Sequence, residues 1–203
     1  MYNSFEEIDF DSLPNEFVIK ATHDSGTVVV CNNKKNLNLH DLKEKMKRGL
    51  SYNYYWYTRE WPYKDVKPRI IIEKKLESNK GVPEDYKIFC FNGKARFWFY
   101  ASDRDTHVKF DYYNMEWNKL PFIQGHPNSD CSIEKPDLWE DMVSVAEFIS
   151  KGFPNIRVDF FIDKYGQFYV GELTMTHFSG LVPFEPDSWD NRIGEMLVLP
   201  NKI

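Results

Sequence analysis

The chain has 203 residues and a mass of 24.2 kDa, enough for one substantial domain or two small lobes. Hydrophobic residues make up 42% and charged residues 28%, which excludes a disordered chain. A net charge of −5 and a pI near 5.6 argue against nucleic acid as a partner. No apolar run approaches the ~20 residues that a transmembrane helix needs.

The cysteines are sparse and widely spaced, at Cys31, Cys90 and Cys131. This pattern provides neither a disulfide framework nor a zinc site. The N-terminus, MYNSFEEIDF, lacks the basic and apolar regions of a signal peptide. We therefore expect a reducing compartment, the cytoplasm.

The first half predicts strands at 16–20 and 27–31, joined by the small and polar loop ATHDSG. A helix is expected from Asn38, because apolar residues then recur at helical spacing. Those residues are Leu39, Leu42, Met46 and Leu50. After an irregular aromatic stretch, SYNYYWYTREWPY, the run RIIIEKKL is typical of a buried strand.

The second half is dominated by hairpins. YKIFCFNGKARFWFY predicts two strands around a type I′ turn at Asn92-Gly93, and RVDFFI and QFYVGEL predict two more around DKYG. A helix is expected from Pro136 to Gly152, with Leu138, Met142, Val145 and Ile149 on one face, and a short one near Trp189. Because β-α-β alternation is missing, the pattern favours an α+β fold with antiparallel sheets.

The last hairpin carries the first group of candidate functional residues. Arg157 and Asp159 are two apart on one strand and share a face, as do Glu172 and Thr174 on the returning strand. Two carboxylates at one cleft repel each other unless a cation lies between them, and oxygen ligands suit Mg²⁺. Arg157 would then face a phosphate or a developing negative charge.

Two further elements have the chemistry of a nucleotide site. Lys20 ends a strand before a loop of small residues, where a cation and backbone N–H groups can bind phosphate. Glu73 and Lys74 end another strand, and Asp85 follows in a position to accept ribose hydroxyls. Taken singly, each of the three elements is more simply explained as an exposed turn or a charged strand end.

Together, the order of these elements resembles that of the ATP-grasp ligases. RVDFFIDKYGQFYVGEL is similar to the metal-binding hairpin of the D-alanine–D-alanine ligase branch, and IIIEKKL to its adenine-binding hinge strand. The chain resembles the TupA-like ATP-grasp family of cell-surface polymer biosynthesis more closely. That resemblance rests on FDSLPNEFVIKATHDSG, REWPYKDVKPRIIIEKKL, PEDYKIFCFNGK and GELTMTHFSG.

The resemblance implies a single ATP-grasp module over 1–203. Its two lobes, a small ATP-binding lobe at 14–75 and a larger one at 76–203, would enclose a nucleotide cleft with antiparallel sheets. Lys20 would contact the ATP phosphates, beneath a mobile flap. The flap would contain Thr22, His23, Ser25 and Gly26. Glu73, Lys74 and Leu76 would line the adenine site, and Asp85 would hold the ribose, with Glu84 as its alternative. Lys87 is a possible second cation for the phosphates.

The same resemblance implies that Asp159 and Glu172 bind Mg²⁺, with Thr174 as a weaker third ligand. Arg157 would stabilise the transferring phosphoryl group or the tetrahedral intermediate. Two departures from the ligase pattern stand out. Thr174 replaces the usual metal-binding Asn, and the N-terminal domain that precedes the ATP-grasp module in such ligases is apparently absent.

The function that the resemblance implies is ATP-dependent carboxylate–amine ligation, with ATP and Mg²⁺ as cofactors and a homodimer as a possible assembly. The acceptor would be a uronic acid or amino acid of a capsule, teichuronopeptide or O-antigen pathway. The stretch with Tyr54, Trp56, Arg59 and Trp61 would recognise it or form a packed aromatic core. The alternatives are a non-catalytic nucleotide-binding subunit or truncated fragment, and a glycosyltransferase whose Asp-x-Asp motif would be Asp103–Asp105.

Overall fold

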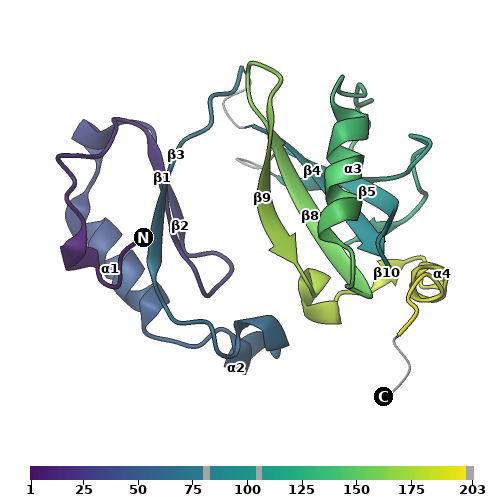
Figure 1. The fold of residues 1–203 in the computed structure, drawn as a ribbon, viewed down its shortest axis with the longest axis horizontal. Coiled ribbons are helices and arrows are strands. Elements are labelled where there is room, and N and C mark those ends of the chain that lie inside the picture. The colour runs from purple at the N-terminus through teal and green to yellow at the C-terminus, as the bar shows by residue number, and fades with distance from the viewer. Residues whose placement is uncertain (80–82, 104–106, 200–203) are drawn as a thin grey trace. The chain divides into compact units, whose positions relative to one another are not determined.

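In the computed structural model, residues 1–79, 83–103 and 107–199 are described. The chain divides into two compact units, Met1–Leu76 and Glu77–Ile203 (Figure 1). Both are built on antiparallel sheets, and the described helices are short and few, so the fold is α+β as predicted. Among the described residues, no helix is long and apolar enough to span a membrane.

The first unit is a three-stranded sheet in the order β2-β1-β3, with one long helix. Its elements are β1 (Phe17–Ala21), β2 (Val28–Cys31), α1 (Leu39–Leu50), the short α2 (Tyr55–Thr58) and β3 (Ile70–Lys74). Asn38 caps α1, because its side chain accepts hydrogen bonds from the backbone N–H groups of His40 and Asp41. Leu42 and Met46 are buried against β1, but Leu39 is exposed, against expectation, because it lies at the first position of the helix.

The second unit is a five-stranded antiparallel sheet in the order β6-β5-β4-β8-β9. Its strands are β4 (Glu84–Phe91), β5 (Lys94–Ser102), β6 (Lys109–Asn114), β8 (Asn155–Ile162) and β9 (Phe168–Thr174). The remaining elements are β7 (Ile123–Gln124), α3 (Trp139–Ile149), β10 (Phe184–Glu185) and α4 (Ser188–Gly194). Asn92 and Gly93 both have positive φ, as the predicted type I′ turn requires.

Helix α3 covers one face of this sheet (Figure 1). It starts at Trp139 and not at Pro136, and the residues it buries are Trp139, Met142 and Ala146. The buried face of α3 is therefore rotated relative to the predicted one, because Val145 and Ile149 are only half-buried. The large indole of Trp139 packs against Trp98 and Tyr86 and sets the orientation of the helix.

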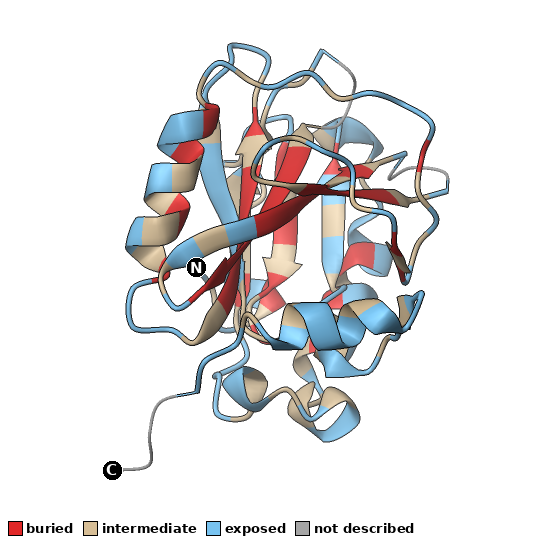
Figure 2. Cartoon of the chain, turned by 90° about the vertical axis from the view of Figure 1, so that its right-hand side faces the viewer, coloured by how far each residue is buried: buried red, intermediate tan, exposed pale blue. Residues whose placement is uncertain are grey.

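The opposite face of the sheet has two chemically different parts. At one end, aromatic side chains of β4, β5 and β6 pack under the β7–β10 segments and α4. At the other end, towards β8 and β9, buried charged residues replace them. Figure 2 shows how the buried residues concentrate along the strands.

Candidate functional site

Three neighbouring strands bring charged residues of the second unit into one row. Lys87 on β4 is the partner of Asp159 on β8, and Asp159 is in turn the partner of Glu172 on β9. The hairpin thus places the two carboxyl-bearing residues opposite one another, as its sequence predicted. The pairing of β4 with β8 adds Lys87 to them.

The pleat of the strands explains why the charges share a face. Successive side chains point to opposite sides of a sheet, so the face that carries Lys87 and Asp159 alternates with the apolar face under α3. Arg157, two residues before Asp159, joins the charged face, while Val158 between them is buried in the apolar core.

Asp159 is fully buried and is held by two cations. Nε of Arg157 lies 2.6 Å from its Oδ1, and Nη2 lies 2.8 Å from its Oδ2. Nζ of Lys87 lies 2.5 Å from Oδ2. Burial alone would raise the pKa of Asp159, but the charges and hydrogen bonds of Arg157 and Lys87 outweigh it and hold that pKa below its ordinary value.

Lys87 also connects a second buried acid to the cluster. Its Nζ lies 3.0 Å from Oδ1 of Asp85, which is fully buried as well. The four side chains together carry two positive and two negative charges. Buried charges are tolerable only when they are compensated in this way. The expected repulsion between Asp159 and Glu172 is therefore not the governing interaction, because Arg157 and Lys87 already neutralise Asp159.

Glu172 and Thr174 lie at the more open side of this cluster. Glu172 is exposed, and its Oε1 accepts a hydrogen bond of 3.1 Å from Oγ1 of Thr174. Among the described residues, no group of three or more His, Cys, Asp or Glu side chains is arranged to hold a metal ion. Asp159 and Glu172 still fit Mg²⁺ by donor chemistry, since Mg²⁺ uses one or two carboxylates and completes its shell with waters and phosphates.

The residue that sequence reasoning missed at this site is His177. Its Nδ1 lies 2.5 Å from Nη1 of Arg157, and its ring packs against Phe89 and Phe99. His177 belongs to the segment GELTMTHFSG, which carried part of the family resemblance. Its place in this segment is the one feature of the sequence that could have identified His177, because a single His after a strand belongs to no periodic pattern.

In the first unit, two of the predicted nucleotide contacts meet. Nζ of Lys20 on β1 lies 2.5 Å from Oε2 of Glu73 on β3, and both side chains are partly exposed. The antiparallel pairing of β1 with β3 places them diagonally, since Lys20 is opposite Ile71. Because this ion pair is partly exposed, Lys20 can release Glu73 and bind another anion in its place.

The loop expected to form a mobile flap is anchored here. His23 is buried, and its Nε2 lies 3.0 Å from the carbonyl oxygen of Gly49 and 3.2 Å from that of Tyr52. Asp24 accepts hydrogen bonds from Thr27 and from the Tyr52 hydroxyl. The His23 side chain therefore faces α1 and not a bound phosphate in this conformation, while Ser25 and Gly26 at the loop tip are exposed.

The other predicted contacts of the first unit differ in exposure. Thr22 is half-buried, and its hydroxyl lies 3.5 Å from the carbonyl oxygen of Lys67. Lys74 is exposed and Leu76 is half-buried. In the aromatic stretch, Trp56 and Trp61 are 61% and 66% exposed, which contradicts a packed aromatic core.

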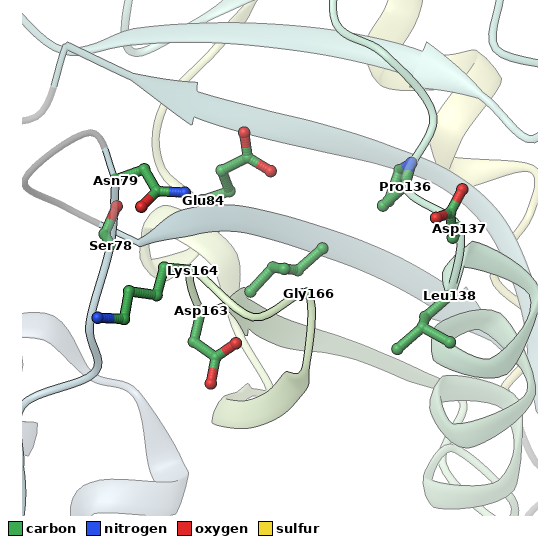
Figure 3. Close-up of a pocket in the computed structure, with 10 residues that line it drawn as sticks. Ser78, Asn79, Glu84, Pro136, Asp137, Leu138, Asp163, Lys164 and Gly166 are labelled. Atoms are coloured by element: carbon green, nitrogen blue, oxygen red, sulfur yellow. The ribbon is translucent and has the colours of Figure 1, made fainter.

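A pocket of about 310 Å³ lies in the second unit, close to the start of β4. Figure 3 shows Glu84 and Asn79 on one side of it and Asp137 and Leu138 on the other. Glu84 reaches this pocket, whereas Asp85 points into the buried cluster. Of the two carboxylates considered for the ribose, Glu84 is thus the accessible one. The Asp-x-Asp alternative extends outside the described residues, at Arg104 and Asp105.

Comparison with models of protein families shows to which family the chain belongs. The model of the family described as TupA-like ATPgrasp matches residues 1–198, nearly the whole chain. The chain belongs to the TupA-like ATP-grasp family. The α+β fold with antiparallel sheets is that of ATP-grasp enzymes, which are generally ATP-dependent ligases.

Solved ATP-grasp structures are similar at low sequence identity. D-alanine–D-alanine ligase from Bacillus anthracis, complexed with ATP, is 17% identical, with a TM-score of 0.46 over 96% of this chain and 54% of that one. N5-carboxyaminoimidazole synthetase from Staphylococcus aureus is 16% identical, with a TM-score of 0.43 over 81% and 35%. The ligase PsnB, complexed with a minimal precursor, Mg and ADP, is 13% identical, with a TM-score of 0.42 over 82% and 40%.

The chain thus spans about a third to a half of the length of these enzymes. No curated protein matches it.

Proposed function

We propose that this TupA-like ATP-grasp protein is an ATP-dependent carboxylate–amine ligase. The observation that supports it most is the buried cluster of Arg157, Lys87 and Asp159, with Glu172 opposite, in a chain whose family is that of ATP-grasp enzymes. Such enzymes rely on positioning and charge neutralisation of phosphates, and this cluster supplies two cations and two carboxylates.

In the proposed reaction, an acceptor carboxylate oxygen attacks the γ-phosphorus of ATP and ADP leaves. The amine then attacks the acyl carbon of the acylphosphate, inorganic phosphate leaves with the bond electrons, and the amine loses a proton. Mg²⁺, when bound at Asp159 and Glu172, would neutralise phosphate oxygens. Lys87 would shift part of its hydrogen bonding from Asp159 to the transferring phosphate, and Arg157 would bind that phosphate through N–H groups that Asp159 does not use.

Lys20 takes the role of a second phosphate contact in this proposal. Its present partner, Glu73, is partly exposed, so the ion pair is weak and readily exchanged. The ribose would bind a carboxylate near the start of β4, for which Glu84 is better exposed than Asp85. Both assignments are independent of the metal site and can be tested separately.

We propose a uronic-acid or amino-acid carboxylate of a cell-surface polysaccharide pathway as the acceptor, modified in the cytoplasm where ATP is available. The exposed indoles of Trp56 and Trp61 support a saccharide contact, because flat apolar faces with polar edges suit sugar rings. Arg59 lies over the Trp56 ring at 5.1 Å and supplies a cation for a carboxylate.

A non-catalytic nucleotide-binding subunit is the second candidate. It is favoured by Asp159, whose two oxygens are already occupied by Arg157 and Lys87. Such a protein would bind ATP through Lys20 and the start of β4 without turning it over. Turnover, and not binding, therefore separates the two functions.

The test is release of ADP and phosphate with a panel of uronic acids and amino acids, each with a panel of amines. We expect ADP and phosphate release to require both a carboxylate and an amine. We also expect Asp159→Asn to lower the rate of release at least 100-fold. Asp130→Asn, at an exposed position, is the matched control. If calorimetry shows that ATP binds but no carboxylate–amine pair gives turnover, the non-catalytic binding subunit is favoured instead.

A further inference from the structure

The guanidinium of Arg157 is held at three of its nitrogen atoms. Nε and Nη2 donate to the two oxygens of Asp159, and Nη1 donates to Nδ1 of His177 at 2.5 Å. An arginine side chain carries five N–H groups. Three are used here, and among the described residues the other two have no partner of their own. These two, one on each terminal nitrogen, are available to an anion.

The hydrogen bond fixes the protonation of His177. Arginine donates and does not accept, so Nδ1 of His177 accepts and the neutral ring carries its proton on Nε2. Burial, and then the positive charge of Arg157, lower the pKa of His177 to about 3. Near neutral pH the imidazole is therefore a permanent acceptor for Arg157.

The backbone around His177 is shaped to hold the ring in this place. His177 begins the 3₁₀ turn His177–Gly180, in which Phe178 and Ser179 have φ values of 50° and 57°. Non-glycine residues seldom adopt the left-handed region, and such strain persists only where surrounding contacts enforce it. Here the His177 ring packs 5.2 Å from Phe89 and 4.2 Å from Phe178, between ring centroids.

We propose that His177 is a positioning residue, which fixes the orientation of the Arg157 guanidinium so that its two remaining N–H groups face the transferring phosphate. This inference rests on the proposed ligase function for its catalytic consequence. Asp159 alone holds the guanidinium along one edge and leaves Nη1 without a partner. With His177 in place, the plane of the guanidinium is fixed before any substrate arrives, which lowers the entropy cost of binding.

Two variants test this role. His177→Phe keeps an aromatic ring but removes the acceptor, whereas His177→Asn restores an oxygen acceptor close to the position of Nδ1. We expect His177→Phe to lower kcat at least tenfold with little change in KM for ATP, and His177→Asn to recover most of the rate. His126→Phe is the control, since His126 also packs on Phe178 but has no described contact with Arg157.

A second readout does not depend on catalysis. The ¹⁵N NMR signals of the Arg157 terminal nitrogens should be separate in the wild type and in His177→Asn, because rotation of the guanidinium is restricted. They should merge in His177→Phe. Unchanged signals in His177→Phe would overturn the proposal, as would an unchanged kcat in an active enzyme. If the wild type turns over no substrate, the ligase function fails, while the NMR result still decides whether His177 orders Arg157.

Discussion

Lys87 and Asp159 are 72 residues apart in the chain, yet Nζ of one lies 2.5 Å from Oδ2 of the other in a buried part of the second unit. The contact follows from the antiparallel pairing of β4 with β8, which makes the two residues direct partners. Lys87 also reaches Asp85, so one ammonium group compensates two buried carboxylates. Lys87 therefore contributes to the stability of this region through both carboxylates, alongside Arg157, which also binds Asp159.

Replacing Lys87 with Met should destabilise the second unit by about 3–5 kcal/mol, because the buried Asp159 and Asp85 would both lose their contact with this ammonium group. Urea unfolding at neutral pH measures the change. Adding Asp85→Asn to Lys87→Met should recover part of the loss, since it removes one of the two buried negative charges that Lys87 contacts. If the double variant is as unstable as the sum of the two single variants, Lys87 and Asp85 are not coupled.

Acid should destabilise the protein through His177 before it does so through Asp159. The pKa of His177 is lowered to about 3 in the folded chain and is near 6.5 when unfolded, so its contribution is complete above pH 6.5 and is lost as the pH falls towards 3. The slope is about 1.4 kcal/mol for each pH unit. Asp159, whose pKa is lowered from 3.8, loses its contribution only below that value.

The free energy of unfolding should therefore fall less between pH 6.5 and 5 in His177→Asn than in the wild type. Urea titrations at several pH values in this interval make the comparison. Parallel curves for the two proteins would show that His177 is not held neutral by burial and by Arg157.

Gly171 should not tolerate a side chain. It lies beside the irregularity where β9 shifts register against β8 after Asp159, and a Cβ at this position would clash with the ring of Phe161. Gly171→Ala should cost about 1–3 kcal/mol and lower ATP turnover by displacing the neighbouring Glu172. Gly194→Ala, in α4 with open space around it, is the matched control and should be neutral or slightly stabilising.

The loop at Thr22–Gly26 should loosen when Tyr52 loses its hydroxyl. That group donates a hydrogen bond of 2.9 Å to Asp24, and it is one of few contacts that fix the loop. Tyr52→Phe should speed hydrogen exchange of the loop amides, consistent with about 1 kcal/mol, while the Tm changes little. Tyr57→Phe is the control, because Tyr57 is 77% exposed and the change keeps its ring contact with Tyr52; it should leave the exchange as it is in the wild type.

Local sequence signals predicted the local structure well. Asn38 caps α1, Asn92-Gly93 forms the tight turn, and alternation in the last hairpin placed Arg157 and Asp159 on one face. These features depend on residues close in the chain, whose physical preferences are readable directly. The family resemblance added the order of the motifs.

The sequence predicted the composition of the charged cluster less well. The pairing of Lys87 with Asp159 depends on which strand lies beside β4, and no short-range pattern encodes that choice. The sequence therefore did not indicate that Arg157 and Lys87 compensate Asp159, and Mg²⁺ between Asp159 and Glu172 stays a prediction. The orientation of α3 was misjudged for a similar reason, because the tertiary packing of Trp139 prevailed over the helical pattern.

The central position of β4 has a consequence for synthesis. Its partner β5 follows at once, but β8 comes off the ribosome only after a long stretch of chain, as the 72-residue separation of Lys87 and Asp159 indicates. At ~5–20 residues per second, one edge of β4 stays unpaired for roughly 4–14 seconds. An unpaired edge beside apolar residues such as Ile88 invites pairing between chains. The nascent protein is therefore most prone to self-association in the interval before β8 enters the sheet.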